Sequence, residues 1–117
     1  SPYAATTPAY PEKPIRLIVG SAPGGGTDNV VRVLGPRMSQ LLGQQVIIDN
    51  RAGAGGNLGM GLAAKSTPDG YTILMGTLFL ATNQSLYSKL TWNAPKDFAP
   101  ISMVTASPVA AQMSAMR

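Results

Sequence analysis

Cysteine and histidine are both absent from this sequence of 117 residues. Without them the chain has no disulfide, no thiolate nucleophile and none of the usual zinc ligand sets. It also lacks the side chain that most often transfers protons near neutral pH. We therefore expect no metal, no cofactor and no catalytic residues, so the protein is not predicted to be an enzyme.

Aromatic and charged residues are also few, at 6% and 12% of the sequence. Nine basic and five acidic residues give a formal net charge of +4, and the basic residues are scattered. A nucleic-acid-binding face usually clusters its charge, so nucleic acid is not an expected partner. The positive balance instead predicts a mild attraction for anionic ligands. No apolar run approaches the length of a membrane span, and a mean hydropathy of +0.09 is typical of a folded domain.

Strand-like and helix-like segments alternate through the first two thirds of the sequence. Strands are predicted over residues 15–20, 46–49 and 71–76, and helices over 28–42 and 57–65. This alternation predicts an α/β fold built on a parallel βαβαβ sheet with right-handed crossovers. It leaves the order of the strands in the sheet open.

Local signals refine the two helices. Thr27 or Asp28 is predicted to cap the first helix, Pro36 to kink it, and Gly43 to end it. Apolar spacing predicts that the second helix buries Leu58, Leu62 and Ala63. Later segments carry weaker patterns. They predict a short helix near 81–87, an extended surface segment at 92–100 and a strand at 101–105.

Two glycine-rich loops follow the first two strands. The first is Ala22–Asp28 (APGGGTD), and the second is Gly53–Gly59 (GAGGNLG). Glycine allows close approach of backbone to a ligand, and a helix start offers unpaired N–H groups at its positive dipole end. Ligands of parallel sheets bind beyond the carboxyl ends of the strands, where both loops are expected. The pattern therefore predicts a cradle for an anion made from backbone amides.

Other interpretations of these residues stay open. The glycines could serve only as tight turns, or Gly53–Gly59 could bind a nicotinamide dinucleotide through its GxGxxxG spacing. However, the third strand is followed by no acid for a ribose hydroxyl. Asp28 is interpreted as a cap rather than a general base. Arg51 could pair with a ligand carboxylate or locally with Asp49.

Several spaced motifs together resemble the Bug family, the substrate-binding proteins of tripartite tricarboxylate transporters. The similar segments, in order, are PIRLIV (14–19), APGGGTD (22–28), LGQQV (42–46), NRAGAGGN (50–57), PDGYT (68–72), LYSKL (86–90) and KDFAPI (96–101). The resemblance extends from about Tyr10 to about Pro108. It covers most of the chain.

This resemblance implies a two-lobed fold like that of periplasmic binding proteins, closing by hinge motion around a small carboxylate or related organic anion. It implies a periplasmic location after removal of a signal peptide, with the transporter's membrane subunits as partners. In relatives the ligand carboxylate meets both loops, partly through ordered water. The substrate-binding residues that it implies are Ala22, Gly25, Gly26, Thr27, Asp28, Ala54, Gly55 and Thr77. Among them Asp28 is implied to cap its helix and hold a water.

The resemblance also predicts the domain organisation. Residues 1–14 form a flexible lead, 15–108 form part of the first lobe, and 109–117 form a tail that differs from the family pattern. Family members are longer, so we expect the chain to stop before the second lobe. An uncovered sheet edge then allows a further alternative, a self-associating fragment without ligand-binding activity.

Overall fold

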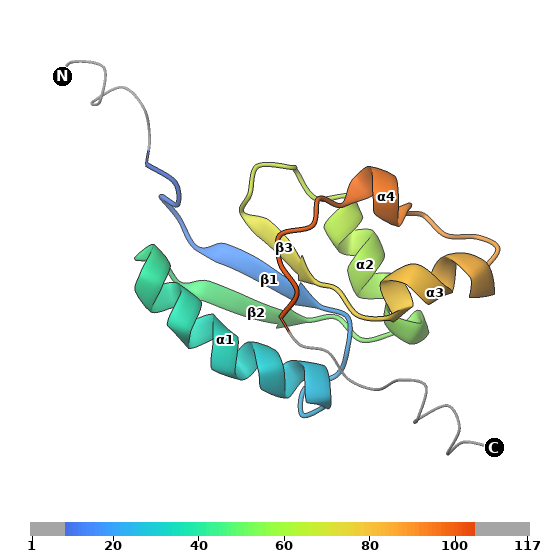
Figure 1. Cartoon of the computed structure of the whole chain (residues 1–117), viewed down its shortest axis with the longest axis horizontal. Coiled ribbons are helices and arrows are strands. Elements are labelled where there is room, and N and C mark those ends of the chain that lie inside the picture. The colour runs from blue at the N-terminus through green and yellow to red at the C-terminus, as the bar shows by residue number, and fades with distance from the viewer. Residues whose placement is uncertain (1–8, 105–117) are drawn as a thin grey trace.

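A computed structural model describes residues 9–104 and confirms the predicted alternation of strands and helices. In chain order the elements are β1 (Ile15–Val19), α1 (Gly26–Leu42), β2 (Val46–Asn50), η1 (Ala54–Gly56), α2 (Asn57–Ala64), β3 (Thr72–Met75), α3 (Phe79–Leu86) and α4 (Ala94–Asp97). Figure 1 shows α1 on one side of the sheet, with α2 and α3 on the other. The fold is therefore a layered α/β arrangement.

The three strands are parallel and lie in the order β2-β1-β3. In the register of the sheet, Ile15 pairs with Val46, and Arg16 pairs with Thr72. The sequence left this order open. Because β1 is central, the connection from β2 to β3 crosses over it, and the loops after β1 and β3 come to lie side by side.

Alternating residues of β1 supply the core. Ile15, Leu17 and Val19 cluster with Val31 of α1 and with β2. Ile18 points to the other face, since successive side chains of a strand alternate, and it is fully buried there. Each of these four side chains is at most 2% exposed. A strand covered on both faces reads as a continuous apolar run, as Leu17, Ile18 and Val19 do.

Helix α1 begins earlier than predicted. Its N-cap is Gly25, which makes no side-chain cap, so the prediction of a Thr27 or Asp28 cap is wrong. Asp28 instead lies in the first turn, and its carboxylate accepts a hydrogen bond from the Gly24 amide at 2.9 Å. The helix continues through Pro36, and Gly43 ends it in the left-handed conformation (φ 71°), as predicted.

The buried face predicted for helix α2 is wrong at Leu58, whereas Leu62 and Ala63 are half-buried. Leu58 is 55% exposed, and the buried residues are Gly59, Met60 and Gly61. Hydrophobic periodicity weighs large side chains, whereas here the glycines allow the helix backbone to approach its neighbours closely. The buried face of this helix therefore combines two glycines with the side chain of Met60.

The later segments match the predictions in part. Helix α3 confirms the short helix predicted near 81–87. The extended surface segment predicted at 92–100 is wrong, since α4 lies within it and Trp92 is only 5% exposed. Helix α4 begins at a typical N-cap residue, since the Asn93 side chain accepts a hydrogen bond from the Lys96 amide at 3.2 Å. Residues 101–104 are exposed and form no strand, and Thr105 lies outside the described residues.

The described part of the N-terminal lead contacts the loop before β3. The Tyr10 hydroxyl donates to the Gly70 carbonyl, and the Glu12 amide donates to the Tyr71 hydroxyl at 2.9 Å. Residues 1–8 and 105–117 lie outside the described part, so the predicted domain boundaries stay predictions. Within residues 9–104, no helix has both the length and the apolar character needed to cross a membrane.

Candidate functional site

A pocket of about 280 Å³ lies at the carboxyl ends of β1 and β3. It is lined by Gly20, Ser21, Thr27, Gly53, Gly55, Gly56, Met60, Leu74, Met75, Thr77 and Phe79. These residues come from both glycine-rich loops and from the segment after β3. Figure 1 shows that the loops leading into α1 and α2 lie at the same end of the sheet. The two loops thus converge on one cavity, as predicted.

Glycine-to-glycine contacts bring the loops together. A Cβ on Gly20 would lie 3.1 Å from the Gly56 carbonyl oxygen, and one on Gly59 would lie 2.9 Å from the Gly20 Cα. Both neighbours are backbone atoms, which have no rotamer through which to move away. Any larger residue would therefore separate the end of β1 from the start of α2.

The first loop presents backbone amides at the start of α1. The first helical hydrogen bond runs from the Asn29 amide to the Gly25 carbonyl, at 3.0 Å. The amides of Gly26, Thr27 and Asp28 precede that bond and have no partner within the helix. The macrodipole adds positive potential at the same point. Thr27 is the member of this turn that lines the pocket.

Asp28 stabilises the first loop from inside. Its carboxylate accepts hydrogen bonds from the Gly24 amide at 2.9 Å and from the Asn50 side chain at 2.9 Å. The Arg32 guanidinium lies 3.3 Å from the same carboxylate. The hydrogen bond from Gly24, then that from Asn50 and the charge of Arg32, lower the pKa of Asp28 despite an opposing effect of burial. The carboxylate is thus ionised and engaged in hydrogen bonds, so Asp28 holds the first loop from within the first turn rather than as the predicted cap.

Arg51 makes the local pair that the sequence suggested as one alternative. Its guanidinium lies 2.8 Å from one oxygen of Asp49, and Arg16 lies 2.5 Å from the other. Burial raises the pKa of Asp49, but hydrogen bonds and charge from these two arginines outweigh it, and the pKa is lowered. Arg51 is also absent from the pocket lining.

The second loop has an unusual backbone. Gly53, Ala54, Gly55 and Gly56 all have positive φ, at 139°, 51°, 65° and 90°. Ala54 carries a Cβ, for which this region costs about 1–2 kcal/mol. Within the loop, the backbone amides that donate hydrogen bonds belong to Gly56 and to later residues. The first of these bonds runs from the Gly56 amide to the Gly53 carbonyl at 3.1 Å. The amides of Ala54 and Gly55 precede these bonds.

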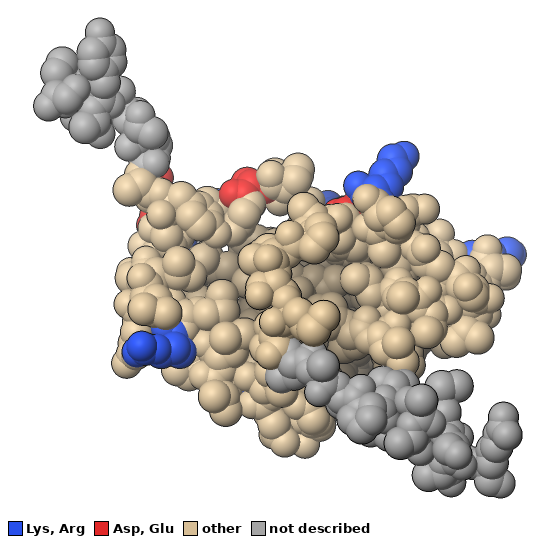
Figure 2. Space-filling view, in the orientation of Figure 1, with Lys and Arg blue, Asp and Glu red and all other residues tan. Residues whose placement is uncertain are grey.

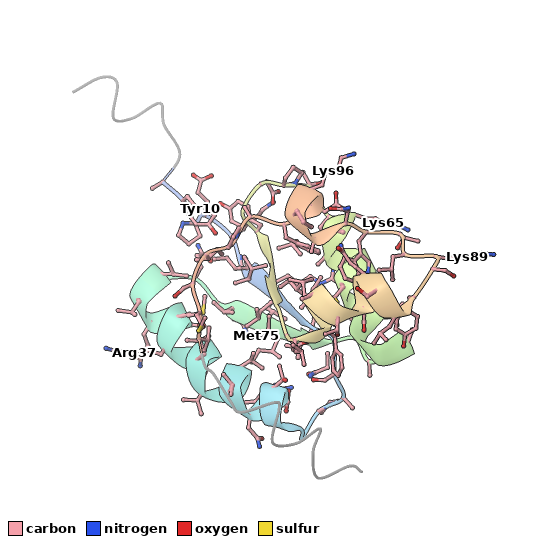
Figure 3. All side chains as sticks on the ribbon, turned by 45° about the vertical axis from the view of Figure 1, so that its right-hand side comes forward. Tyr10, Arg37, Lys65, Met75, Lys89 and Lys96 are labelled. Carbon is pink, nitrogen blue, oxygen red and sulfur yellow. The ribbon has the colours of Figure 1, made fainter. Side chains whose placement is uncertain are left out.

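The pocket wall combines backbone polarity with apolar side chains. None of its lining residues is charged, and Met60, Leu74, Met75 and Phe79 supply an apolar surface. Figure 3 shows Met75 near the centre of the molecule, whereas the labelled lysines point outward. In Figure 2 the charged side chains lie at the margins of the visible face. Such a pocket suits a ligand with an anionic head and a hydrocarbon body.

Some of the predicted site residues line the pocket, and the others lie beside it. Thr27, Gly55 and Thr77 line the pocket. The other predicted residues lie in the adjoining loops but outside the lining: Ala22, Gly25, Gly26, Asp28 and Ala54. The assignment of these eight residues to substrate binding stays a prediction.

Sequence reasoning missed several residues of the site. Ser21 directly precedes the first glycine-rich loop in the sequence. It lines the pocket, and its buried hydroxyl has no hydrogen-bond partner among the described residues. Asn83 of α3 is 1% exposed and donates to the Gly55 carbonyl. No sequence signal marks Asn83, because an asparagine in a short helix is usually exposed.

The strand order argues against the nicotinamide dinucleotide alternative. Folds that bind these dinucleotides place the third strand beside the second, in the order 3-2-1. Here β3 lies beside β1 instead. In sheets of the order 2-1-3 the ligand binds between the ends of β1 and β3, where this pocket lies. The fold and the site are therefore those of a parallel α/β domain whose pocket lies at the switch point between β1 and β3.

Comparison with known proteins identifies the family. Residues 30–115 match the family described as "Tripartite tricarboxylate transporter family receptor". The chain is 43% identical to Protein BugT of Bordetella pertussis over 106 residues, which are 89% of this chain and 32% of BugT. The chain therefore belongs to this family of transporter receptors, the Bug family indicated by its motifs.

Solved structures agree with this result. The periplasmic binding protein BugD is 42% identical, with a TM-score of 0.69 over 72% of this chain and 28% of BugD. MatC of Rhodopseudomonas palustris, solved with bound malate, is 34% identical, with a TM-score of 0.72 over 81% of this chain and 33% of MatC. The chain thus spans about a third of the length of these relatives.

Proposed function

We propose that this chain forms part of a periplasmic receptor that captures a small carboxylate for a tripartite tricarboxylate-type transporter. The observation that carries the proposal is the convergence of two glycine-rich loops on one uncharged pocket between β1 and β3. Family membership and the malate bound to MatC support a carboxylate as the ligand. The transporter's membrane subunits are the proposed partners.

In this proposal the ligand's negative charge meets backbone amides rather than basic side chains. Gly25, Gly26 and Thr27 donate from the first loop, and Ala54 and Gly55 donate from the second. Fixed amides at a helix start favour an anion without any reorganisation of long side chains. The Thr77 hydroxyl accepts from the Phe79 amide at 3.3 Å, which leaves its hydrogen free to donate to the ligand.

The apolar wall then contacts the body of the acid. Met60 is 2% exposed, and Met75 packs against the core cluster, so this wall is held in place from behind. Methionine side chains adapt to ligands of different shape. Affinity of small ligands depends on burial of most of their surface, and this pocket is open on one side. We therefore expect weak binding to this chain alone and tighter binding when it is joined to the rest of a Bug protein.

Calorimetry tests the proposal directly. The probes are malate, succinate, citrate, glutamate and benzoate, titrated into this chain and into a chimera extended with the remaining sequence of BugT. Succinamide, which keeps the succinate skeleton without its charge, is the matched control ligand. We expect heat from at least one acid and none from succinamide. No heat from any acid in the extended protein would contradict the proposal.

A self-associating fragment remains the competing function, because β2 and β3 are the edges of the described sheet. It predicts a solution mass that rises with protein concentration and a melting temperature that no acid changes. Light scattering over a hundredfold concentration range, with and without malate, separates the two functions.

A further inference from the structure

We propose that Asn83 is a positioning residue that holds the second glycine-rich loop in its ligand-binding form. The inference rests on the proposed function, because it gives Asn83 its role through the amides of that loop. Asn83 lies on α3, outside both glycine-rich loops, and it is not one of the residues that line the pocket. It acts on a ligand only through the loop that it holds.

The contacts of Asn83 carry this inference. Its side-chain amide donates to the Gly55 carbonyl at 3.0 Å and to the Asn57 side-chain oxygen at 2.9 Å. The residue is 1% exposed, so these bonds form away from water. A buried polar group without partners is costly, and this one has two on a single loop. One side chain of α3 thereby ties η1 to the start of α2.

The loop needs an external restraint of this kind. Four successive residues from Gly53 to Gly56 have positive φ, a conformation that persists only where the surroundings determine it. The bond to the Gly55 carbonyl fixes the peptide plane between Gly55 and Gly56. With that plane held, the turn that presents the amides of Ala54 and Gly55 is restrained at its centre.

The end of α3 supplies a second restraint on the same residue. The Tyr87 hydroxyl lies 2.8 Å from the point where a Cβ of residue 55 would be. The loop thus lies between Asn83 and Tyr87, and a Cβ at residue 55 would require the exposed Tyr87 side chain to move. Helix α3 therefore does more than follow β3 along the chain, because it determines the shape of the loop opposite Thr27.

The test compares Asn83→Ala with Ser39→Ala. Ser39 is a matched control, since its hydroxyl also makes two bonds, to the Gly35 carbonyl at 3.0 Å and from the Val46 amide at 2.9 Å. These bonds lie at the amino end of β2, away from the pocket. Malate and succinate are titrated into each variant of the BugT-extended protein, and the melting temperature without ligand is measured in parallel.

We expect both variants to lose thermal stability, whereas Asn83→Ala alone weakens acid binding, by about tenfold for each lost restraint. Unchanged affinity in Asn83→Ala, or an equal loss in Ser39→Ala, overturns the inference. Should Asn83→Ala fail to fold, Asn57→Ala removes one of the two acceptors and is expected to weaken binding to a smaller extent. Unchanged affinity in that variant likewise overturns the inference.

A second readout separates this inference from the proposed function. Amide hydrogen exchange at Ala54, Gly55 and Gly56 is measured without ligand in wild type, Asn83→Ala and Ser39→Ala. Faster exchange at these positions in Asn83→Ala alone supports the restraint even if no acid binds to the wild type. Equal exchange in all three proteins overturns it, whatever the calorimetry shows.

Discussion

Gly59 offers the sharpest test of how the two loops are joined. In Gly59→Ala the new Cβ would lie 2.9 Å from the Gly20 Cα and 3.2 Å from the Arg51 carbonyl oxygen. Both are backbone atoms, so α2 itself must move away from the end of β1. Overpacking of this kind costs about 1–3 kcal/mol, and alanine returns up to about 1 kcal/mol of helix propensity.

The expected net loss in the free energy of unfolding is about 1–2 kcal/mol, or a fall in Tm of roughly 5–15 °C. Urea unfolding followed by Trp92 fluorescence measures it. Trp92 is the single tryptophan of the chain and is 5% exposed. Its ring also lies 3.7 Å from the point where a Cβ of Gly61 would be, so it reports on α2.

Gly35→Ala in α1 is the matched control. There a Cβ would lie 3.1 Å from Ile48 Cδ1, the tip of a side chain that moves at little cost. The same helix propensity is gained, so we expect stability between unchanged and about 1 kcal/mol higher. A Gly59→Ala protein as stable as Gly35→Ala would refute the reasoning, because the backbone contact at Gly20 would then carry no cost.

Three further outcomes are expected. Gly55→Ala, at φ 65° and facing the Tyr87 hydroxyl, should lose about 1–2 kcal/mol of stability and most acid affinity, measured by urea unfolding and calorimetry. Ser21→Ala should leave Tm within a few degrees but weaken malate binding about two- to tenfold, because its unpartnered hydroxyl is free to donate to the acid. Unchanged malate affinity would exclude that contact. Asp28 and Asp49 have lowered pKa values in the folded state, so their stabilisation is complete above the unfolded-state pKa and is lost as pH falls through the folded one. Tm should therefore be level above about pH 5 and fall below about pH 4, and a Tm that rises on acidification would contradict this sign.

The pH experiment has its own internal control. Asp28→Asn and Asp49→Asn each remove one titrating group while keeping the side-chain shape. Each variant should have a lower Tm than wild type at pH 7 and a smaller further loss between pH 5 and pH 3. The two effects should add, because Asp28 and Asp49 share no hydrogen-bond or ion-pair partner among the described residues.

The errors of the sequence predictions share one physical origin. The second helix was expected to bury Leu58, because periodicity counts large apolar residues, yet its glycines form the contact with β1. The 92–100 segment was expected to be extended, because its prolines mask the Asn93 cap. In both cases a packing contact or a capping hydrogen bond outweighed the average preference of the segment.

The amino-acid sequence by itself determined the alternation of strands and helices, the positions of both glycine-rich loops and the family. These depend on residue spacing over a few turns, which periodicity and motif order report directly. Only the tertiary structure decided the strand order β2-β1-β3, the glycine contacts between the loops and the restraint by Asn83. Those features join residues far apart in the chain, such as Asn83 and Gly55 at a separation of 28 positions, and no local pattern encodes which distant groups will meet.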